Sequence, residues 1–195
     1  MKTPNALILA CSPRKNGNSD CLAQWTGDIA QKKGYLVDII YLRNYNFRPC
    51  LACGACNKDG VCHVNDELKS IYPKILAAEK LFIAAPIFFQ SLGGLAKSMI
   101  DRMQCFWAAQ NILHQKVITD PQLAQKRRLY PILCAATNLK DTFSCAEKTL
   151  KIFGKTIEAQ YHEGIFIPGV DEKGAVNNQK IKELVFEQLE QFFAN

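Results

Sequence analysis

The sequence predicts a doubly wound α/β domain, in which helices cover both faces of a parallel sheet. Short apolar runs without polar alternation recur along the chain, which is typical of strands buried on both faces. Segments with helical patterning alternate with these runs, and such alternation favours parallel strands. The length of 195 residues and the hydrophobic content of 48% suit one globular unit with a sizeable core. We therefore expect a single domain over residues 1–195, without a linker or an internal repeat.

The first half of the chain is expected to form three strands and two helices. Residues 5–10 are a short apolar run without polar alternation, so they are expected to form a buried strand. Residues 18–34 follow a polar loop and stop at a glycine, which indicates a helix, and the β-rich residues 35–42 then form the second strand. Residues 66–78 begin at a capping Asn-Asp pair and carry apolar residues at helical spacing. The third strand is expected at residues 80–85.

The second half of the chain continues the same alternation. A helix is expected at residues 92–107, and the apolar run at residues 129–136 predicts the fourth strand. Residues 142–155 are expected to form the next helix and residues 162–167 the fifth strand. An amphipathic helix near residues 177–193 closes the chain.

Composition and charge exclude several classes of protein. The net charge of +6 is scattered, and the one compact run, Lys126-Arg127-Arg128, lacks the interleaved aromatics of a nucleic-acid surface. We read this run as a solvated face and expect no nucleic-acid partner. No segment approaches the roughly 18 apolar residues of a membrane span. The N-terminal residues lack the pattern of a signal peptide, so a cytoplasmic location is expected.

The loop after the first strand has the composition of a phosphate site. It contains hydroxyls, an amide, an arginine and a glycine at the start of a helix, where backbone N–H groups favour an anion. It matches neither the Gly-x-x-x-x-Gly-Lys-Ser/Thr loop of nucleotide triphosphatases nor the Gly-x-Gly-x-x-Gly loop that binds a pyrophosphate. A terminal monophosphate, such as that of FMN, suits it better. The alternative is a polar turn in which Asn18 or Ser19 caps the helix. The candidate residues are Ser12, Arg14, Asn16, Gly17, Asn18 and Ser19.

Two further loops should lie beside the phosphate loop. In a sheet of this kind, ligands bind beyond the carboxyl ends of the strands, where the strand order reverses. The loop after the third strand offers an apolar wall for a flat ring at Pro86, Ile87, Phe88 and Phe89. The alternative is that both phenylalanines belong to the core. Ala136 and Thr137 follow the fourth strand and would form a third wall.

These motifs carry a resemblance to a known family. The Ser-Pro-Arg-x-x-Gly-Asn-Ser loop, the Pro-x-Phe loop and the Lys97-x-x-x-Asp101-Arg102 segment resemble the NAD(P)H-dependent FMN reductase group of flavodoxin-like proteins. The resemblance implies a five-stranded sheet of order 2-1-3-4-5. It also implies that the FMN phosphate is held by Ser12, Arg14, Asn18 and Ser19, with the isoalloxazine beside residues 86–89. The group often has a tyrosine where this chain has Phe88, and Lys97 and Asp101 are expected to form an intrahelical ion pair.

A second motif lies in a cysteine-rich loop at residues 48–64. Cys50, Cys53, Cys56 and Cys62 have the spacing C-x2-C-x2-C-x5-C, with small residues between them. This pitch lets one loop wrap a cubane, much as in bacterial ferredoxins. It resembles the compact motif of the iron–sulfur flavoproteins, which implies that these four cysteines hold a [4Fe–4S] cluster. A zinc site and an unmetallated thiol-rich loop are the alternatives. The other five cysteines are read as core: Cys11, Cys21, Cys105, Cys134 and Cys145.

The leading functional prediction is an iron–sulfur flavoprotein that passes electrons between a [4Fe–4S] cluster and FMN. A small or protein electron donor and acceptor would be its partners, with NAD(P)H as a possible donor, and no acid–base catalytic residue is expected. The resemblance further implies a homodimer or homotetramer. One alternative is a clusterless NAD(P)H-dependent reductase of quinones, flavins or nitroaromatics. Another, from a different class, is a binding module that holds zinc.

Overall fold

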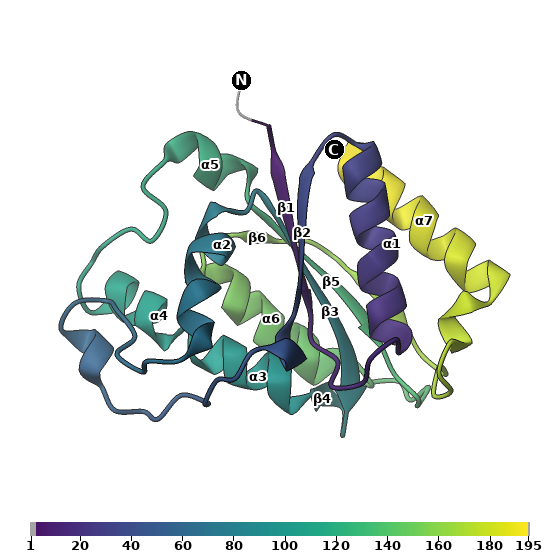
Figure 1. Ribbon diagram of the computed structural model, residues 1–195, viewed down its shortest axis with the longest axis horizontal. Coiled ribbons are helices and arrows are strands. Elements are labelled where there is room, and N and C mark those ends of the chain that lie inside the picture. Colours follow the sequence, from purple (N-terminus) through teal and green to yellow (C-terminus); the bar gives the residue numbers. More distant parts are fainter. Residues whose placement is uncertain (1–2, 195) are drawn as a thin grey trace.

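The sheet of the protein is predominantly parallel and lies at the centre of the molecule. A computed structural model describes residues 3–194. Along the main path of the sheet the strand order is β2-β1-β3-β5-β6 (Figure 1). These pairings are all parallel, so the carboxyl ends of the strands meet along one edge. The strands are β1 (Asn5–Ala10), β2 (Leu36–Tyr41), β3 (Lys80–Phe88), β5 (Arg128–Cys134) and β6 (Gln160–Tyr161).

Helices cover both faces of the sheet, as the apolar runs predicted. In β1 the side chains of Leu7 and Leu9 join the core on one face, and those of Ala6 and Ile8 join the core on the other. One face is covered by α1 (Asn18–Lys32) and α7 (Gln179–Ala194). The other is covered by α2 (Tyr72–Ala77), α3 (Gly94–Asp101), α4 (Gln104–Asn111) and α6 (Ser144–Thr156) (Figure 1).

The sheet has seven strands, where five were expected. One addition is β4 (Ser91–Leu92), which turns back from β3 as an antiparallel hairpin. The other arises because the expected fifth strand is broken into β6 and β7 (Ile165–Ile167), which pair with opposite ends of β5.

Pro131 explains the break in the fifth strand. Ala135 donates its N–H to Ile167, so the N–H groups of alternate residues of β5 point toward β7. Residue 131 belongs to the same set, but proline has no N–H to donate. At this point Gly164 lies against Pro131. The chain therefore leaves the ladder between β6 and β7.

Gly164 is expected to tolerate no side chain. A Cβ built there would collide with the carbonyl oxygen of Pro131 and would lie 2.8 Å from its Cδ. We expect Gly164→Ala to lower the free energy of unfolding by about 2–3 kcal/mol, as overpacking does. The measurement is urea unfolding, with Gly94→Ala as the control, because a Cβ at Gly94 meets nothing within 4 Å. Equal stability of the two variants would contradict this prediction.

Two of the predicted helices are shorter than expected. The segment 66–78 divides into a 3-10 turn (Glu67–Ser70) and α2, and the Asp66 carboxylate caps the turn by accepting from the N–H of Leu68. The segment 92–107 breaks at Arg102 and Met103, between α3 and α4, with a hydrogen bond of 3-10 type from Met103 to Ile100. A short helix, α5 (Pro121–Lys126), was not predicted.

The prediction that the Lys126–Arg128 run is solvated is wrong for Arg127, which is fully buried. Its guanidinium donates to backbone carbonyl oxygens at the end of α2 and the end of α6: those of Ile75, Leu76, Ala78, Ile157 and Glu158. Burial lowers the pKa of Arg127 to about 10. This residue therefore joins three segments of the fold and is not free to meet a ligand. Within residues 3–194, no helix is long and apolar enough to cross a bilayer.

Candidate functional site

A cavity of about 130 Å³ opens at the carboxyl edge of the sheet, where the loop after β1 meets the ends of β3 and β5. It brings together eight of the twelve residues predicted to bind a cofactor. They are Ser12, Arg14, Asn18, Ser19, Pro86, Ile87, Phe88 and Ala136. Cys134, Val170 and Asp171 complete the lining. The sequence predicted that the loop after β1 and the ends of β3 and β5 meet here. It did not indicate the loop at residues 170–171.

The wall formed by the loop after β1 presents hydrogen-bond donors around the start of α1. Ser12 and Ser19 are 3% and 2% exposed, and the Ser12 hydroxyl accepts the N–H of Arg14 at 3.2 Å. The Ser19 hydroxyl lies 3.3 Å from the Cys134 thiol. Gly17 is the N-cap of α1 and has no side chain to cap the helix. The alternative to a phosphate site, a turn in which the side chain of Asn18 or Ser19 caps the helix, is therefore wrong. The helix α1 begins at Asn18 itself.

The side chain of Asn18 makes contacts that the sequence did not indicate. Its amide nitrogen donates to the carbonyl oxygens of Val170 and Glu172, and its amide oxygen accepts the N–H of Gly174. The side chain thus anchors the loop that follows β7 and has three protein partners already. Four other predicted residues lie outside the cavity lining: Asn16, Gly17, Phe89 and Thr137.

An ion pair that the sequence did not reveal lies beneath the loop after β1. Asp20, in the first turn of α1, is 7% exposed and accepts from Arg43 at 2.8 Å. Arg43 follows β2 and also donates to the carbonyl oxygens of Ser12 and Arg14. Without this partner, the buried carboxylate would oppose an anion at the helix N-terminus. Arg43 therefore offsets the Asp20 charge and holds the loop in place.

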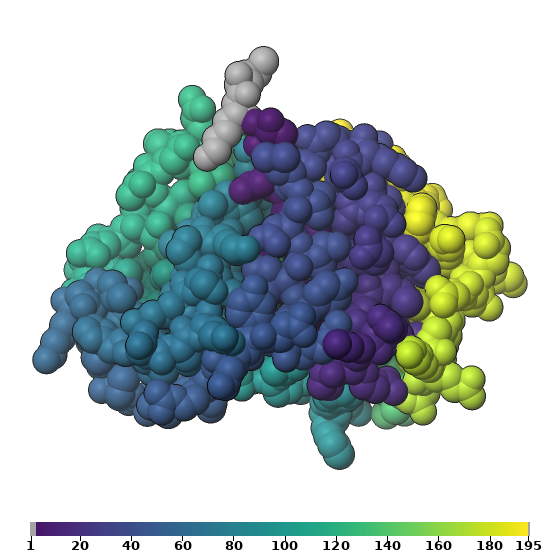
Figure 2. Space-filling model, viewed as in Figure 1, coloured from purple at the N-terminus to yellow at the C-terminus, as the bar shows by residue number. Residues whose placement is uncertain are grey.

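The Phe88–Phe89 pair lies on the turn between β3 and β4. The alternative, that these rings belong to the core, is wrong: Phe88 is 42% exposed and Phe89 is fully exposed. Phe89 and Gln90 have φ angles of 50° and 60°, which strains residues other than glycine by roughly 1 kcal/mol each. This turn stands out from the surface at the lower edge of Figure 2. The fold thus presents an aromatic tip next to the cavity.

The cysteine-rich loop forms a second cavity, of about 290 Å³. All four cysteines of the motif line it, and Cys105 of α4 joins them. No carboxylate is among the lining residues. Ala52 and Gly54 have φ angles of 50° and 69°, so the chain winds tightly between the cysteines.

The four thiols are arranged differently from the ligands of a single ion. Within residues 3–194, no three His, Cys, Asp or Glu side chains are placed to hold one metal ion. Zinc requires four ligands at about 2.3 Å from one centre, so its thiolates must be close to one another. In a cubane each thiolate binds a different iron, which sets the sulfurs further apart. The cavity lining offers the four thiols of the motif, with the Cys105 thiol and the His63 imidazole beside them.

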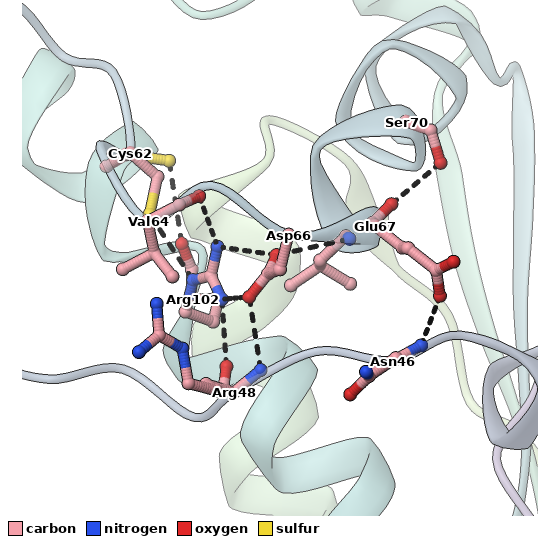
Figure 3. Close-up of polar contacts among 10 residues, drawn as sticks. Asn46, Arg48, Cys62, Val64, Asp66, Glu67, Ser70 and Arg102 are labelled. Carbon is pink, nitrogen blue, oxygen red and sulfur yellow. Dashed lines mark hydrogen bonds and ion pairs between the residues drawn. The ribbon is translucent and has the colours of Figure 1, made fainter.

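A buried arginine connects the two ends of this loop (Figure 3). Arg102 is 1% exposed and forms a two-pronged ion pair with Asp66, at 2.7 and 3.2 Å. It donates to the carbonyl oxygens of Arg48 and Val64 and, through Nε, to the Cys62 sulfur at 3.3 Å. Arg102 belongs to the Lys97-x-x-x-Asp101-Arg102 segment, but the sequence indicated no role for it.

Arg102 also shapes the electrostatics of the loop. Burial alone would raise the pKa of Cys62, but hydrogen bonds from the Val64 N–H and from Arg102 outweigh it and lower that pKa. Burial likewise opposes ionisation of Asp66, yet the bonds from Arg102 and the Arg48 N–H hold the pKa of Asp66 below its usual range. The surroundings of both groups therefore stabilise the anionic form relative to its usual stability.

The remaining predictions about residues near the site are confirmed in part. Lys97 and Asp101 form the expected intrahelical ion pair, at 2.6 Å. Three of the five cysteines read as core are buried, namely Cys11, Cys105 and Cys134. Cys21 is only partly buried and Cys145 is exposed, so the prediction is wrong for these two.

Comparison with known proteins decides the family. The sequence profile of the NADPH-dependent FMN reductases matches residues 4–166. The chain belongs to the NADPH-dependent FMN reductase family. Family membership favours a flavin-dependent redox protein over the zinc-holding binding module considered above.

Two curated relatives of this chain carry the name iron–sulfur flavoprotein. The one from Methanosarcina thermophila is 32% identical over 91 residues, which is 47% of this chain and 48% of the relative. The one from Archaeoglobus fulgidus is 32% identical over 96 residues, or 49% of this chain and 47% of the relative. The match to this chain thus spans about half the length of the curated relatives.

Solved structures agree on the fold. An NAD(P)H:quinone oxidoreductase from Methanothermobacter marburgensis superposes with a TM-score of 0.69 at 10% identity, covering 98% of this chain and 95% of the other. An FMN-dependent NADH-azoreductase from Bacillus anthracis, solved with FMN, gives a TM-score of 0.65 at 11% identity, covering 97% and 98%. At these identities the likeness establishes the flavodoxin-like reductase fold.

Proposed function

We propose that this FMN reductase is an iron–sulfur flavoprotein, which passes electrons between FMN at the sheet edge and a [4Fe–4S] cluster in the cysteine-rich loop. The observation that carries the proposal is the second cavity, where Cys50, Cys53, Cys56 and Cys62 converge without a carboxylate. Soft thiolate donors of this kind select iron–sulfur clusters. The names of the curated relatives support the same conclusion.

In this proposal the FMN phosphate lies in the smaller cavity. The Ser12 and Ser19 hydroxyls, the Arg14 guanidinium and the backbone N–H groups from Gly17 to Ser19 supply donors and positive charge. About 130 Å³ is below the roughly 300–1,000 Å³ of pockets that enclose a drug-sized ligand. The isoalloxazine would therefore lie outside the phosphate cavity. Its walls would be residues 86–89 and Ala136 with Thr137.

The two cofactors supply complementary chemistry, since flavin exchanges one or two electrons and the cluster exchanges one. The chain contributes position and charge. The two cavities share no lining residue, so the flavin site and the cluster site are separate within one subunit. A homodimer or homotetramer, in which the cysteine-rich loop of one subunit faces the flavin of another, would bring them together. NAD(P)H, or a small or protein donor, would supply electrons to a small or protein acceptor.

The second candidate is a clusterless NAD(P)H-dependent reductase of quinones, flavins or nitroaromatics. The names of the structural neighbours, a quinone oxidoreductase and an azoreductase, favour it. Rapid flavin reduction by NADH or NADPH in a preparation without iron would support this candidate over the first.

A comparison of FMN binding with riboflavin binding tests the phosphate site. We expect Arg14→Ala to weaken FMN binding about tenfold, equivalent to roughly 1.4 kcal/mol, because it removes one charge from the phosphate. Riboflavin lacks the phosphate, so its affinity should be unchanged. Fluorescence quenching of each flavin gives the two dissociation constants, and Lys15→Ala, on the same exposed loop, is the matched control. An equal loss for both flavins would place the phosphate elsewhere.

A further inference from the structure

Arg102 makes one contact in the cysteine-rich loop beyond its ion pair and its bonds to carbonyl oxygens. Its guanidinium is among the largest fully buried side chains of the protein, and it lies inside the cysteine-rich loop. Asp66 and two carbonyl oxygens would already satisfy four of its N–H groups. The fifth donor, Nε, points to the sulfur of Cys62 (Figure 3).

This contact sets Cys62 apart from the other three cysteines of the motif. Five residues separate Cys62 from the tightly spaced group, and it lies at the point where the loop returns to the fold. Among the described residues, it is the member of the four whose sulfur accepts from a charged side chain. Arg102 binds the chain before the motif, at Arg48, and after it, at Val64. The same side chain therefore fixes the width of the loop and the direction of the Cys62 sulfur.

We propose that Arg102 is a positioning residue that orients Cys62 toward the cluster and raises the reduction potential of that cluster, an inference that rests on the proposed function. Hydrogen bonds to cluster sulfurs and the local charge are two of the terms that set such potentials. Reduction adds one negative charge to the cluster, and a buried N–H donor on a cation stabilises the more negative form. Asp66 moderates the effect, because its carboxylate offsets part of the guanidinium charge.

Two substitutions should move the potential in opposite directions. In Arg102→Lys the charge stays, but a single ammonium replaces the planar fork and is drawn to Asp66, so Cys62 loses its donor. We expect the ratio of reduced to oxidised cluster at a fixed potential to fall about tenfold, a shift of about 59 mV for one electron. Asp66→Asn keeps the shape but leaves the guanidinium charge unbalanced, so the potential should rise.

The experiment is a mediated redox titration of each anaerobically purified protein, followed by electron paramagnetic resonance, with iron counted per chain. Arg127→Lys is the matched control, because Arg127 is equally buried but none of its partners belongs to the cysteine-rich loop. It should leave the potential at the wild-type value.

Opposite shifts for the Arg102 and Asp66 variants, with none for the Arg127 variant, would support the inference. Iron-loaded variants with the wild-type potential would overturn it, as would a shift of the same size in Arg127→Lys. If Arg102→Lys does not fold, the Asp66→Asn variant decides, since an unchanged or lower potential contradicts the inference. Wild-type protein without iron would instead overturn the proposed function, and this inference with it.

Discussion

Arg102→Met is expected to lower the free energy of unfolding by about 3 kcal/mol or more. The change leaves the carboxylate of Asp66, whose side chain is 9% exposed, without its charged partner. Breaking a buried ion pair from one side costs about this much, because the remaining charge stays desolvated. The carbonyl oxygens of Arg48 and Val64 lose their donor as well. Urea unfolding, followed by circular dichroism, measures the difference.

The double variant Asp66→Asn with Arg102→Met separates charge from shape. It removes both charges, so no unpaired ion is left in the loop, and it should recover part of the lost stability. A double variant that is no more stable than Arg102→Met would contradict the ion-pair explanation. It would mean that the packing of the arginine stem, or its bonds to carbonyl oxygens, accounts for the whole effect.

Cys50→Ala is expected to cost the protein most of its iron. If Cys50 is one of four cluster ligands, its removal opens the coordination of one iron, and we expect a fall from about four irons per chain to well under one. Colorimetric iron analysis of the anaerobic protein, with the flavin content measured on the same sample, gives the result. Flavin should be retained, because Cys50 lies outside the phosphate cavity.

Cys105→Ala is the matched control for this experiment. Cys105 lines the same cavity and is 2% exposed, but it lies on α4 outside the motif, and its thiol donates to the carbonyl oxygen of Arg102. Burial raises the pKa of Cys105 to about 12, so it favours the neutral thiol. We expect the variant to keep about four irons. Loss of iron from Cys105→Ala, with retention in Cys50→Ala, would reverse the assignment of ligands.

Much of the site lay in contiguous stretches of sequence and could be predicted from them. The phosphate loop, the Pro86–Phe88 stretch and the four cysteines each form a local motif, and the parallel sheet places the first two at one edge. The motifs did not predict the ion pairs between residues that are distant in the sequence and that only the fold brings together. Asp66 and Arg102 are 36 residues apart, and Asp20 and Arg43 are 23 apart. Nothing local marks either pair.

The errors in the fold have identifiable causes. The prediction of a continuous fifth strand is wrong because Pro131, in the neighbouring strand β5, has no N–H to donate to it. The alternative of placing Phe88 and Phe89 in the core rests on their hydrophobicity, whereas the antiparallel return of β4 puts them on an exposed turn. Asn18 matched the phosphate motif, but a loop 152 residues away takes up its amide. In each case tertiary context overrides a local preference.

The central claim is that one chain holds both FMN and a [4Fe–4S] cluster. The most direct test is an absorbance spectrum of protein purified without oxygen, with iron and acid-labile sulfide measured on the same sample. We predict a flavin spectrum over a broad shoulder near roughly 400 nm, with about four irons and four sulfides per chain. A clean flavin spectrum without iron would contradict the claim. It would identify the protein as a clusterless reductase of the same family.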